Sequence, residues 1–444
     1  MPIESVPGTD LKYYLIAFDK DGRERADDAG GLMSPRILQV LGNEPVTDVF
    51  ILSHGWKGDI PAAREQYNAW IGAMARNEAD RERMRTARPG FRSLLVGFHW
   101  PSQPWGDEKL GGGVSFDLTD APSVEDLVNE WATRIADTDP ARDALKTIFA
   151  AARRDLMPDA LPPDVKAAYE TLNREAGLGG DGVAGAPGAD REPFDPEQYY
   201  QVARLDEMLD GAMDFGGGGF SLGGLLSPLR QLSFWMMKAR ARKVGESGGA
   251  RLLAELQRAA KDNVRFHLMG HSFGCIVVSS MLCGEGGHGQ LARPADSLAL
   301  AQGAVSLWSY CSSIEQAEGQ PGYFRALIAD RRVRGPIITT RSRFDTAVGR
   351  FYPIGAGIAD QVSFDANQLP KYGGIGAFGI QGPGIEIVNM EMKQASEGYG
   401  FEAGKVYNLD CSGFINQGGG AAGAHSDIAK SAVAHAVWEA ARES

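Results

Sequence analysis

The stretch from Val264 to Leu282 limits the possible folds of this chain more than any other part of it. Alternating apolar residues at its start predict a short β-strand, and the small and apolar residues at its end predict a helix. Between them lies Gly270-His-Ser272-Phe-Gly274, a serine flanked by glycines. A serine at a sharp strand-to-helix turn has a strained backbone and needs neighbours with little Cβ bulk. The stretch therefore predicts an exposed Ser272 hydroxyl at the end of a sheet strand.

The pattern Gly-x-Ser-x-Gly alone is weak evidence, because 57 of the 444 residues are glycine. The chain contains the pattern twice more, around Ser221 and Ser247. Ser221 follows a run of four glycines, and Ser247 lies in a polar break between helical stretches, so neither has a strand before it. We expect only Ser272 to occupy a strand-to-helix turn.

Apolar runs that predict strands alternate with helix patterns along much of the chain. Besides the strand before Ser272, strands are predicted at 13–18, 46–53, 93–98, 297–306, 335–340 and 405–409. Buried strands that alternate with helices are typical of a parallel sheet covered by helices. A hydrophobic content of 43% is sufficient for a core of that size. We therefore expect an α/β fold.

The segment that follows the strand at 93–98 has a different character. It contains helix patterns and glycine- and proline-rich breaks, but no strand pattern. Ligands of open α/β sheets bind at the carboxyl ends of the strands, so an insertion there lies over the site. We expect residues 103–225 to form a helical cap, or lid, over a core made of residues 1–102 and 226–444. The aromatic residues that we expect to line an apolar pocket are Trp105, Phe215 and Phe220.

The cap is followed by a pattern that predicts one helix over residues 227–257, returning to the core. Its amphipathic part, 233–242, carries aromatic and methionine residues on one side and Lys and Arg on the other. Such a helix can lie on a lipid surface. Packing in the core is the interpretation that we prefer.

Composition excludes several classes of function. There are 45 basic and 57 acidic residues and no dense Lys/Arg stripe, so nucleic-acid binding is not expected. No integral membrane segment and no signal peptide are recognisable. The four cysteines lack metal-type spacing and are expected to be buried free thiols: Cys275, Cys283, Cys311 and Cys411. We expect a cytoplasmic protein.

A serine hydroxyl needs a general base to become a nucleophile, and the base needs a carboxylate to orient it. Of the seven histidines, His425 lies in a glycine-rich loop after the last strand, just before a helix predicted from Ser426 to Arg442. Asp345 follows the strand that ends at Thr340 and is our choice for the carboxylate. The competing aspartates are Asp330, Asp360, Asp365 and Asp410. A helix-capping histidine and an Asx-turn aspartate are the alternative interpretations.

Two backbone amides are predicted to bind the negative charge that develops on a carbonyl oxygen. One belongs to Phe273, directly after the serine, and the other to Trp56, where a preceding glycine permits close approach of the backbone. The side chain of Trp56 could alternatively serve core packing. Four further residues are candidates for contact with a substrate: His54, Gly55, His271 and Trp100.

Together these motifs resemble the α/β-hydrolase superfamily. They are a strand followed by His54-Gly-Trp, a strand followed by Trp100-Pro-Ser, Gly-His-Ser272-x-Gly, and a later aspartate and histidine in the order Ser…Asp…His. Within the superfamily the chain resembles a bacterial branch of serine esterase- and lipase-like proteins. The resemblance covers residues 1–102 and 226–444, and the long helical insertion departs from minimal members.

The resemblance implies a mostly parallel, eight-stranded sheet flanked by helices. It also implies Ser272 as nucleophile, His425 as base and Asp345 as the residue that orients the base. We therefore expect a serine hydrolase that cleaves small-molecule carboxylic esters through an acyl-enzyme. No metal or organic cofactor is expected, because no ligand cluster or Walker-type phosphate loop is present. The alternatives are a lipase, phospholipase or acyltransferase with the same triad, and an interaction protein with an idle triad.

Overall fold

The computed structural model describes residues 3–26, 31–56, 60–102, 123–210, 224–351, 369–419 and 422–444. Nine strands in these ranges form one sheet, in the order β1-β2-β4-β3-β5-β6-β7-β9-β8. β1 runs antiparallel to β2, and every other neighbouring pair is parallel. The strands are β1 (Ile3–Ser5), β2 (Lys12–Ala17), β3 (Asp48–Ser53), β4 (Ser93–His99), β5 (Arg265–His271), β6 (Ser297–Ala301), β7 (Ile337–Arg341), β8 (Ile387–Glu391) and β9 (Val406–Asp410). The predicted α/β class and mostly parallel sheet are confirmed.

The expected count of eight strands is wrong. The two strands at the edges of the sheet, β1 and β8, had no strand pattern in the sequence. β1 has only three residues, and the residues of β8 are at most half-buried. An edge strand with a solvent-exposed face lacks the continuous apolar run that marks a central parallel strand.

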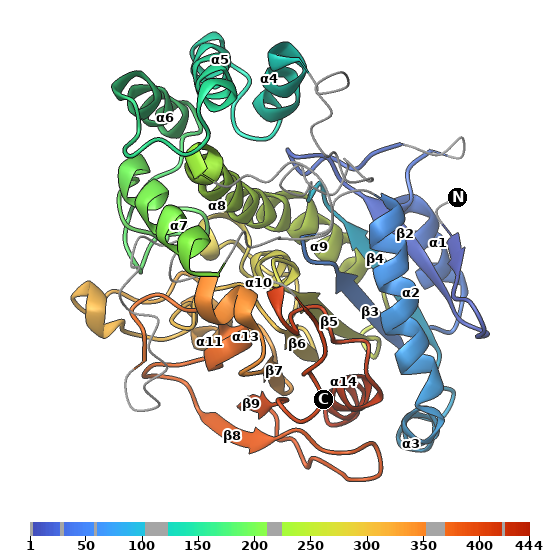
Figure 1. Cartoon of the computed structure of the whole chain (residues 1–444). Coiled ribbons are helices and arrows are strands. Elements are labelled where there is room, and N and C mark those ends of the chain that lie inside the picture. Colours follow the sequence, from blue (N-terminus) through green and yellow to red (C-terminus); the bar gives the residue numbers. More distant parts are fainter. Residues whose placement is uncertain are drawn as a thin grey trace.

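Helices cover both faces of the sheet (Figure 1). They are α1 (Ser34–Asn43), α2 (Ile60–Arg76), α3 (Glu78–Ala87), α4 (Val124–Ala132), α5 (Asp139–Arg154), α6 (Pro163–Glu175), α7 (Pro196–Asp210), α8 (Ser227–Val244), α9 (Ala250–Ala259), α10 (Gly274–Cys283), α11 (Arg325–Ala329), α13 (Ile375–Phe378) and α14 (Ser431–Arg442). Successive side chains of β3 alternate between the two faces, as the twofold period of a strand requires. Val49 and Ile51 pack with α1, α8, α9 and α10, whereas Phe50 and Leu52 pack with α2, α3 and α14.

The insertion between β4 and β5 has a hydrophobic core of its own, built from α4, α5 and α6 with Tyr200 of α7. Figure 1 shows α4, α5 and α6 grouped away from the strands. This core continues into the first turns of α8 through Leu229 and Leu232. The rest of α8 packs on the sheet, so this one helix connects the two cores. The predicted pocket residues Trp105, Phe215 and Phe220 lie outside the described residues.

The helix predicted over 227–257 is continuous but not uniform. A π-helical turn, η2 (Gly245–Gly249), joins α8 to α9. Trp235, Met237 and Lys238 are fully buried in α8, so this part of the chain packs inside the protein, as preferred over lipid contact. No helix in the described ranges is long and apolar enough to cross a membrane.

The Gly-x-Ser-x-Gly match around Ser247 lies inside the π-helical turn. The Ser247 hydroxyl donates a hydrogen bond to the carbonyl of Lys243 at 2.7 Å. No strand precedes it, as expected, although the helix continues where the sequence indicated a break. The third match, around Ser221, lies outside the described residues.

Candidate active site

Ser272 occupies the turn between β5 and α10, which confirms the predicted strand, turn and helix. Its φ of 55° lies in the left-handed region, a costly conformation for a residue with a Cβ. Backbone hydrogen bonds hold it there: its N–H donates to Ala301, and its carbonyl accepts from Cys275 and Ala304. The residue is 5% exposed, less than expected, because the loops that carry its neighbours cover it.

Close backbone approach explains two glycines at this turn. A Cβ on Gly274 would lie 2.2 Å from the carbonyl oxygen of Ser53, at the end of β3. A Cβ on Gly55 would lie 2.7 Å from the Cβ of Ser272. The loop after β3 therefore packs directly against the serine, and neither position has room for a side chain.

His425 connects the serine to a carboxylate. Its Nε2 lies 2.8 Å from Ser272 Oγ, and its Nδ1 lies 2.8 Å from Asp345 Oδ2. Since the carboxylate can only accept, Nδ1 carries the hydrogen and Nε2 accepts from the serine hydroxyl. The structure thus brings together the three residues that the sequence suggested. They come from the segments after β5, β7 and β9.

The carboxylate of Asp345 is buried and fully hydrogen-bonded. Oδ2 accepts from His425 and from Gln302 Nε2 at 2.9 Å, and Oδ1 accepts from the Val348 N–H at 3.1 Å. A buried carboxylate needs such donors to remain charged. The sequence analysis missed Gln302. Its place directly after β6 could have indicated it, since the carboxyl ends of parallel strands share one edge of the sheet.

His271 contacts the His425 loop rather than the serine hydroxyl. Its Nε2 donates to the carbonyl oxygen of His425 at 2.9 Å, and the two rings lie 5.0 Å apart. Its Nδ1 accepts from Gln66 Nε2 at 3.3 Å. A second link joins the loops themselves, because the N–H of Ala424 donates to the carbonyl of Phe344 at 2.8 Å.

The predicted amide of Phe273 precedes the first turn of α10. None of the described residues accepts a hydrogen bond from this N–H. It lies at the positive end of the helix dipole, next to the serine. The Trp56 ring stacks on the Phe273 ring at 6.0 Å, so both predicted amides belong to residues that pack on each other.

His54 and Trp100, which we expected to contact substrate, are fully buried. The two rings stack 5.8 Å apart, and Trp100 Nε1 donates to the carbonyl of His54 at 3.0 Å. His54 Nε2 also lies 2.9 Å from Nδ1 of His99. Burial lowers the pKa of His99 well below the usual value for histidine. This packing assigns both residues to the support of the loop rather than to substrate contact.

An aromatic group lies beside the serine. Phe234 of α8 packs on Phe273 at 5.1 Å and on Trp56 at 6.4 Å, measured between ring centroids. Phe234 and Trp56 are half-buried. Aromatic residues near the serine were expected from the cap and not from α8. The position of Phe234 in an amphipathic helix gave no sign of contact with the turn.

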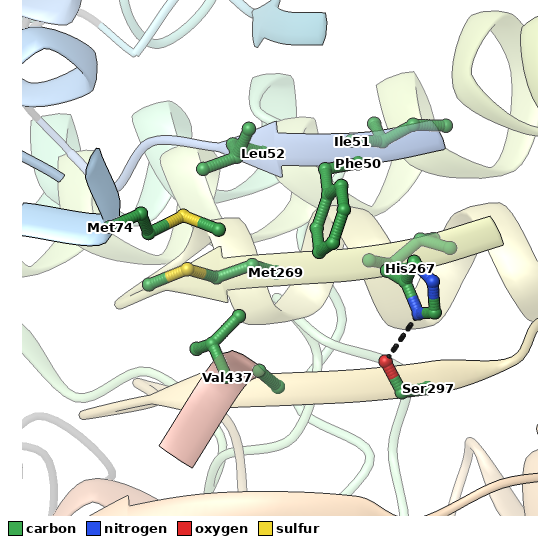
Figure 2. A pocket seen from close by; sticks show the side chains of 10 residues that line it. Phe50, Ile51, Leu52, Met74, His267, Met269, Ser297 and Val437 are labelled. Atoms are coloured by element: carbon green, nitrogen blue, oxygen red, sulfur yellow. Dashed lines mark hydrogen bonds between the residues drawn. The ribbon is translucent and has the colours of Figure 1, made fainter. Parts of the chain in front are cut away.

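A second Ser–His–Asp arrangement lies at the amino ends of the central strands, opposite the end that carries Ser272. His267 Nε2 is 3.0 Å from Asp48 Oδ1, and its Nδ1 is 2.8 Å from Ser297 Oγ (Figure 2). Asp48 and Ser297 are the first residues of β3 and β6, so this group lies at the amino ends of the strands. Burial lowers the pKa of His267 although Asp48 opposes this.

The small cavity beside this group is lined by core residues of β3, β5, β6, α2 and α14 and is drawn in Figure 2. Its other labelled lining residues are Phe50, Ile51, Leu52, Met74, Met269 and Val437. Arg88, itself buried, pairs with Asp48. The group is therefore a satisfied structural network, because a substrate cannot reach a serine sealed between sheet and helix.

One cluster in the described ranges has a composition that could hold a metal ion: Asp80, His435 and Glu439. However, His435 Nδ1 donates to Asp80 at 2.8 Å and its Nε2 donates to the carbonyl of Glu397 at 2.6 Å. Both ring nitrogens therefore carry hydrogens, which leaves no lone pair for a metal. Arginines also pair with the two carboxylates, as expected for an ion-pair network.

No model of a known protein family matches this chain, and no curated protein or solved structure matches it either.

Proposed function

We propose that this protein is a serine hydrolase of carboxylic esters, with Ser272 as nucleophile, His425 as general base and Asp345 as its orienting carboxylate. The observation that carries this proposal is the continuous hydrogen-bonded path from Ser272 Oγ through the imidazole to Asp345, with 2.8 Å at each step. It lies at the carboxyl ends of a parallel sheet, where ligands of such folds bind.

In the proposed reaction, His425 Nε2 takes the proton of Ser272 Oγ as the oxygen attacks the ester carbonyl. Asp345 holds the ring and stabilises the imidazolium. The amides of Phe273 and Trp56 bind the oxyanion, each contributing about 3 kcal/mol of transition-state stabilisation. Collapse of the intermediate expels the alcohol, which takes the proton from His425, and leaves an acyl-serine.

Water then attacks the acyl-serine. His425 removes its proton, the same amides bind the second oxyanion, and the acid leaves as His425 returns the proton to Ser272. The proton moves each time through His425, whose Nε2 lies 2.8 Å from the serine oxygen. No charged side chain other than the triad is required.

The backbone at Ser272 is strained. A left-handed conformation at a non-glycine residue costs about 1–3 kcal/mol. Strained residues cluster at active sites, where the surrounding structure holds them in place. The strain is in keeping with a nucleophile at this turn, although the exposed residues Glu318 and Arg331 have similar φ values.

The aromatic group of Phe234, Trp56 and Phe273 supports an apolar acyl group in the substrate. These rings lie beside the serine, whereas the triad supplies the polar groups. A pocket with apolar walls and a few polar groups is the usual form of a small-molecule site.

Labelling with a fluorophosphonate probe, together with hydrolysis of p-nitrophenyl esters, tests the proposal. We expect the wild type to be labelled and active, and Ser272→Ala to be neither. Ser247→Ala is the matched control, because it changes a serine in the same five-residue pattern that has no base beside it. An unlabelled, folded wild type would contradict the proposal.

A further inference from the structure

Gln302 lies directly after β6 and is fully buried. Its Nε2 donates to Asp345 Oδ2 at 2.9 Å and to the carbonyl of Gly376 at 3.2 Å. Its Oε1 accepts from Thr340 Oγ1 at 2.9 Å. Two acceptors face the nitrogen and a donor faces the oxygen, so the orientation of the amide is fixed.

The backbone of Gln302 is held as firmly as its side chain. Its φ is 44°, a left-handed value, and its N–H donates to Thr340 Oγ1 at 2.9 Å. The hydroxyl of Thr340 therefore binds both ends of the residue. Gly376 closes the other side, since a Cβ there would lie 3.0 Å from Asp345 Oδ2 and 2.7 Å from the backbone of Gln302.

Four neighbouring strands thus each contribute one residue to a single row. Ser272 follows β5, Gln302 follows β6, Asp345 follows β7 and His425 follows β9. Gln302 is the one member that touches neither the serine nor the histidine. Its only contact with the row is the carboxylate oxygen that also accepts from His425.

We infer that Gln302 is a positioning residue for the base: by fixing the carboxylate of Asp345, it sets the orientation of the His425 ring. This inference rests on the proposed function. Without the amide, Oδ2 keeps His425 as its single donor, and on the other side only the Val348 N–H still holds Oδ1, so the carboxylate is less tightly fixed. The imidazole would then lose the fixed line from Asp345 to Ser272 on which proton transfer depends.

The Gln302 amide carries no charge, and this matters for its role beside Asp345. An arginine or lysine at this place would also hold the carboxylate, but it would neutralise the charge that stabilises the imidazolium. A glutamine donates a hydrogen bond and adds no net charge. It therefore orients Asp345 while leaving its negative charge available to His425.

The test compares Gln302→Met, which keeps the length of the side chain and removes the donor, with Gln257→Met. Gln257, on the helix α9, is also buried. Its amide nitrogen donates to the carbonyl of Arg293, and its amide oxygen accepts from the N–H of the same residue. Active sites are counted by fluorophosphonate labelling, so that misfolded molecules are excluded. We expect kcat per labelled site to fall roughly tenfold to a hundredfold in Gln302→Met, with KM unchanged. Gln257→Met should keep the wild-type kcat per site.

Thr340 supplies a second arm that does not alter Gln302. Thr340→Val removes the hydroxyl that holds Oε1, and we expect a smaller loss of kcat per labelled site. Thr340→Ser keeps a hydroxyl and should keep kcat per labelled site close to the wild-type value. Equal kcat per labelled site in the two glutamine variants would overturn the inference. Equal values for Thr340→Val and wild type would also contradict it.

The outcomes also separate this inference from the proposed function. If the folded wild type is neither labelled nor active, both are wrong. If labelling depends on Ser272 but Gln302→Met behaves like Gln257→Met, the triad stands and the positioning role of Gln302 is wrong.

Discussion

The negative charge of Asp345 is the property of a single residue on which the proposed mechanism depends most. Asp345→Asn keeps the shape of the side chain but presents His425 with an amide in place of a carboxylate. The amide favours the wrong tautomer of the imidazole and cannot stabilise the imidazolium. We expect kcat for p-nitrophenyl esters to fall about 10⁴-fold with the fold intact by circular dichroism.

Asp410→Asn is the control for this substitution. Asp410 also ends a strand and was a competing choice in the sequence, but its carboxylate pairs with Arg341 at 3.1 Å on a partly exposed surface. Its removal should leave kcat unchanged. Similar losses in the two variants would show that the effect of Asp345→Asn is not specific to the triad.

Gly55 allows a second test at a single residue. In Gly55→Ala the new methyl group would collide with the Cβ of Ser272, which must move or push the Trp56 loop away. We expect kcat/KM to fall roughly a hundredfold, as for other small misplacements of reacting groups. Gly42→Ala in α1 is the control, because a Cβ there meets nothing within 4 Å. It should leave kcat/KM unchanged and stabilise the helix by about 0.5–1 kcal/mol.

At this scale the sequence indicated the residues that terminate strands and missed those defined by what they touch. Ser272, Asp345 and His425 could be chosen because each follows a strand in a suitable chain order. Gln302 follows a strand too, but nothing in a sequence says that its amide meets Asp345. Phe234 could not be found, since its role depends on which way α8 lies across the turn.

Phe234 of α8 packs on Phe273, and we expect its ring to contact the acyl group of the proposed substrate. In Phe234→Ala the apolar wall beside Phe273 is shortened, and a substrate loses contact with it in proportion to its acyl length. We expect kcat/KM for hexanoyl esters to fall by about tenfold while that for acetyl esters is unchanged. Phe194→Ala is the control, because its ring stacks on Tyr199 within the insertion. A uniform loss for all esters would contradict the assignment.

The helices α3 and α14 are joined by the interaction of His435 with Asp80, and its contribution to stability depends on pH. Burial alone would lower the pKa of His435, but its hydrogen bonds to Asp80 and Glu397 raise it above the usual value. The folded state therefore favours the protonated ring. This stabilisation is complete below the pKa of the unfolded chain, about 6.5, and is lost as the pH rises through the higher folded pKa.

His435→Gln should accordingly reduce the free energy of unfolding more at pH 6 than at pH 9. Urea denaturation at the two pH values measures this difference. His288→Gln is the control, since His288 lies in a loop with no such partners among the described residues. An equal loss at both pH values would mean that His435 acts through packing alone.

Elements with a strong periodic pattern were predicted well, and those shaped by tertiary contacts were not. The strands β2, β3, β4, β7 and β9 begin and end within two residues of their expected bounds, whereas β6 ends at Ala301 rather than at residue 306. α14 begins at Ser431 rather than Ser426, because the carboxylate of Asp427 binds the N–H groups of Asn416 and Gln417 instead of capping the helix. That contact spans a loop and leaves no trace in local sequence.

At the scale of the whole molecule, the described residues form three cores, two on the faces of the sheet and one in the insertion. We expect Ile148→Ala, in the core of the insertion, to cost roughly 2–5 kcal/mol there and to speed amide hydrogen exchange in α4, α5 and α6. Exchange in α10 should not change. Ile276→Ala, in a core of the sheet, should show the reverse. Uniform acceleration by either variant would indicate a single cooperative unit.

The three residues of the triad are far apart along the chain. Ser272 and His425 are separated by 153 positions, and Asp345 and His425 by 80. During synthesis on a ribosome, the serine leaves the exit tunnel long before its base does. Until then it is an ordinary alcohol, so under the proposed mechanism a nascent chain would have no esterase activity. Appearance of probe labelling would therefore time the moment at which the last strand and the His425 loop join the sheet.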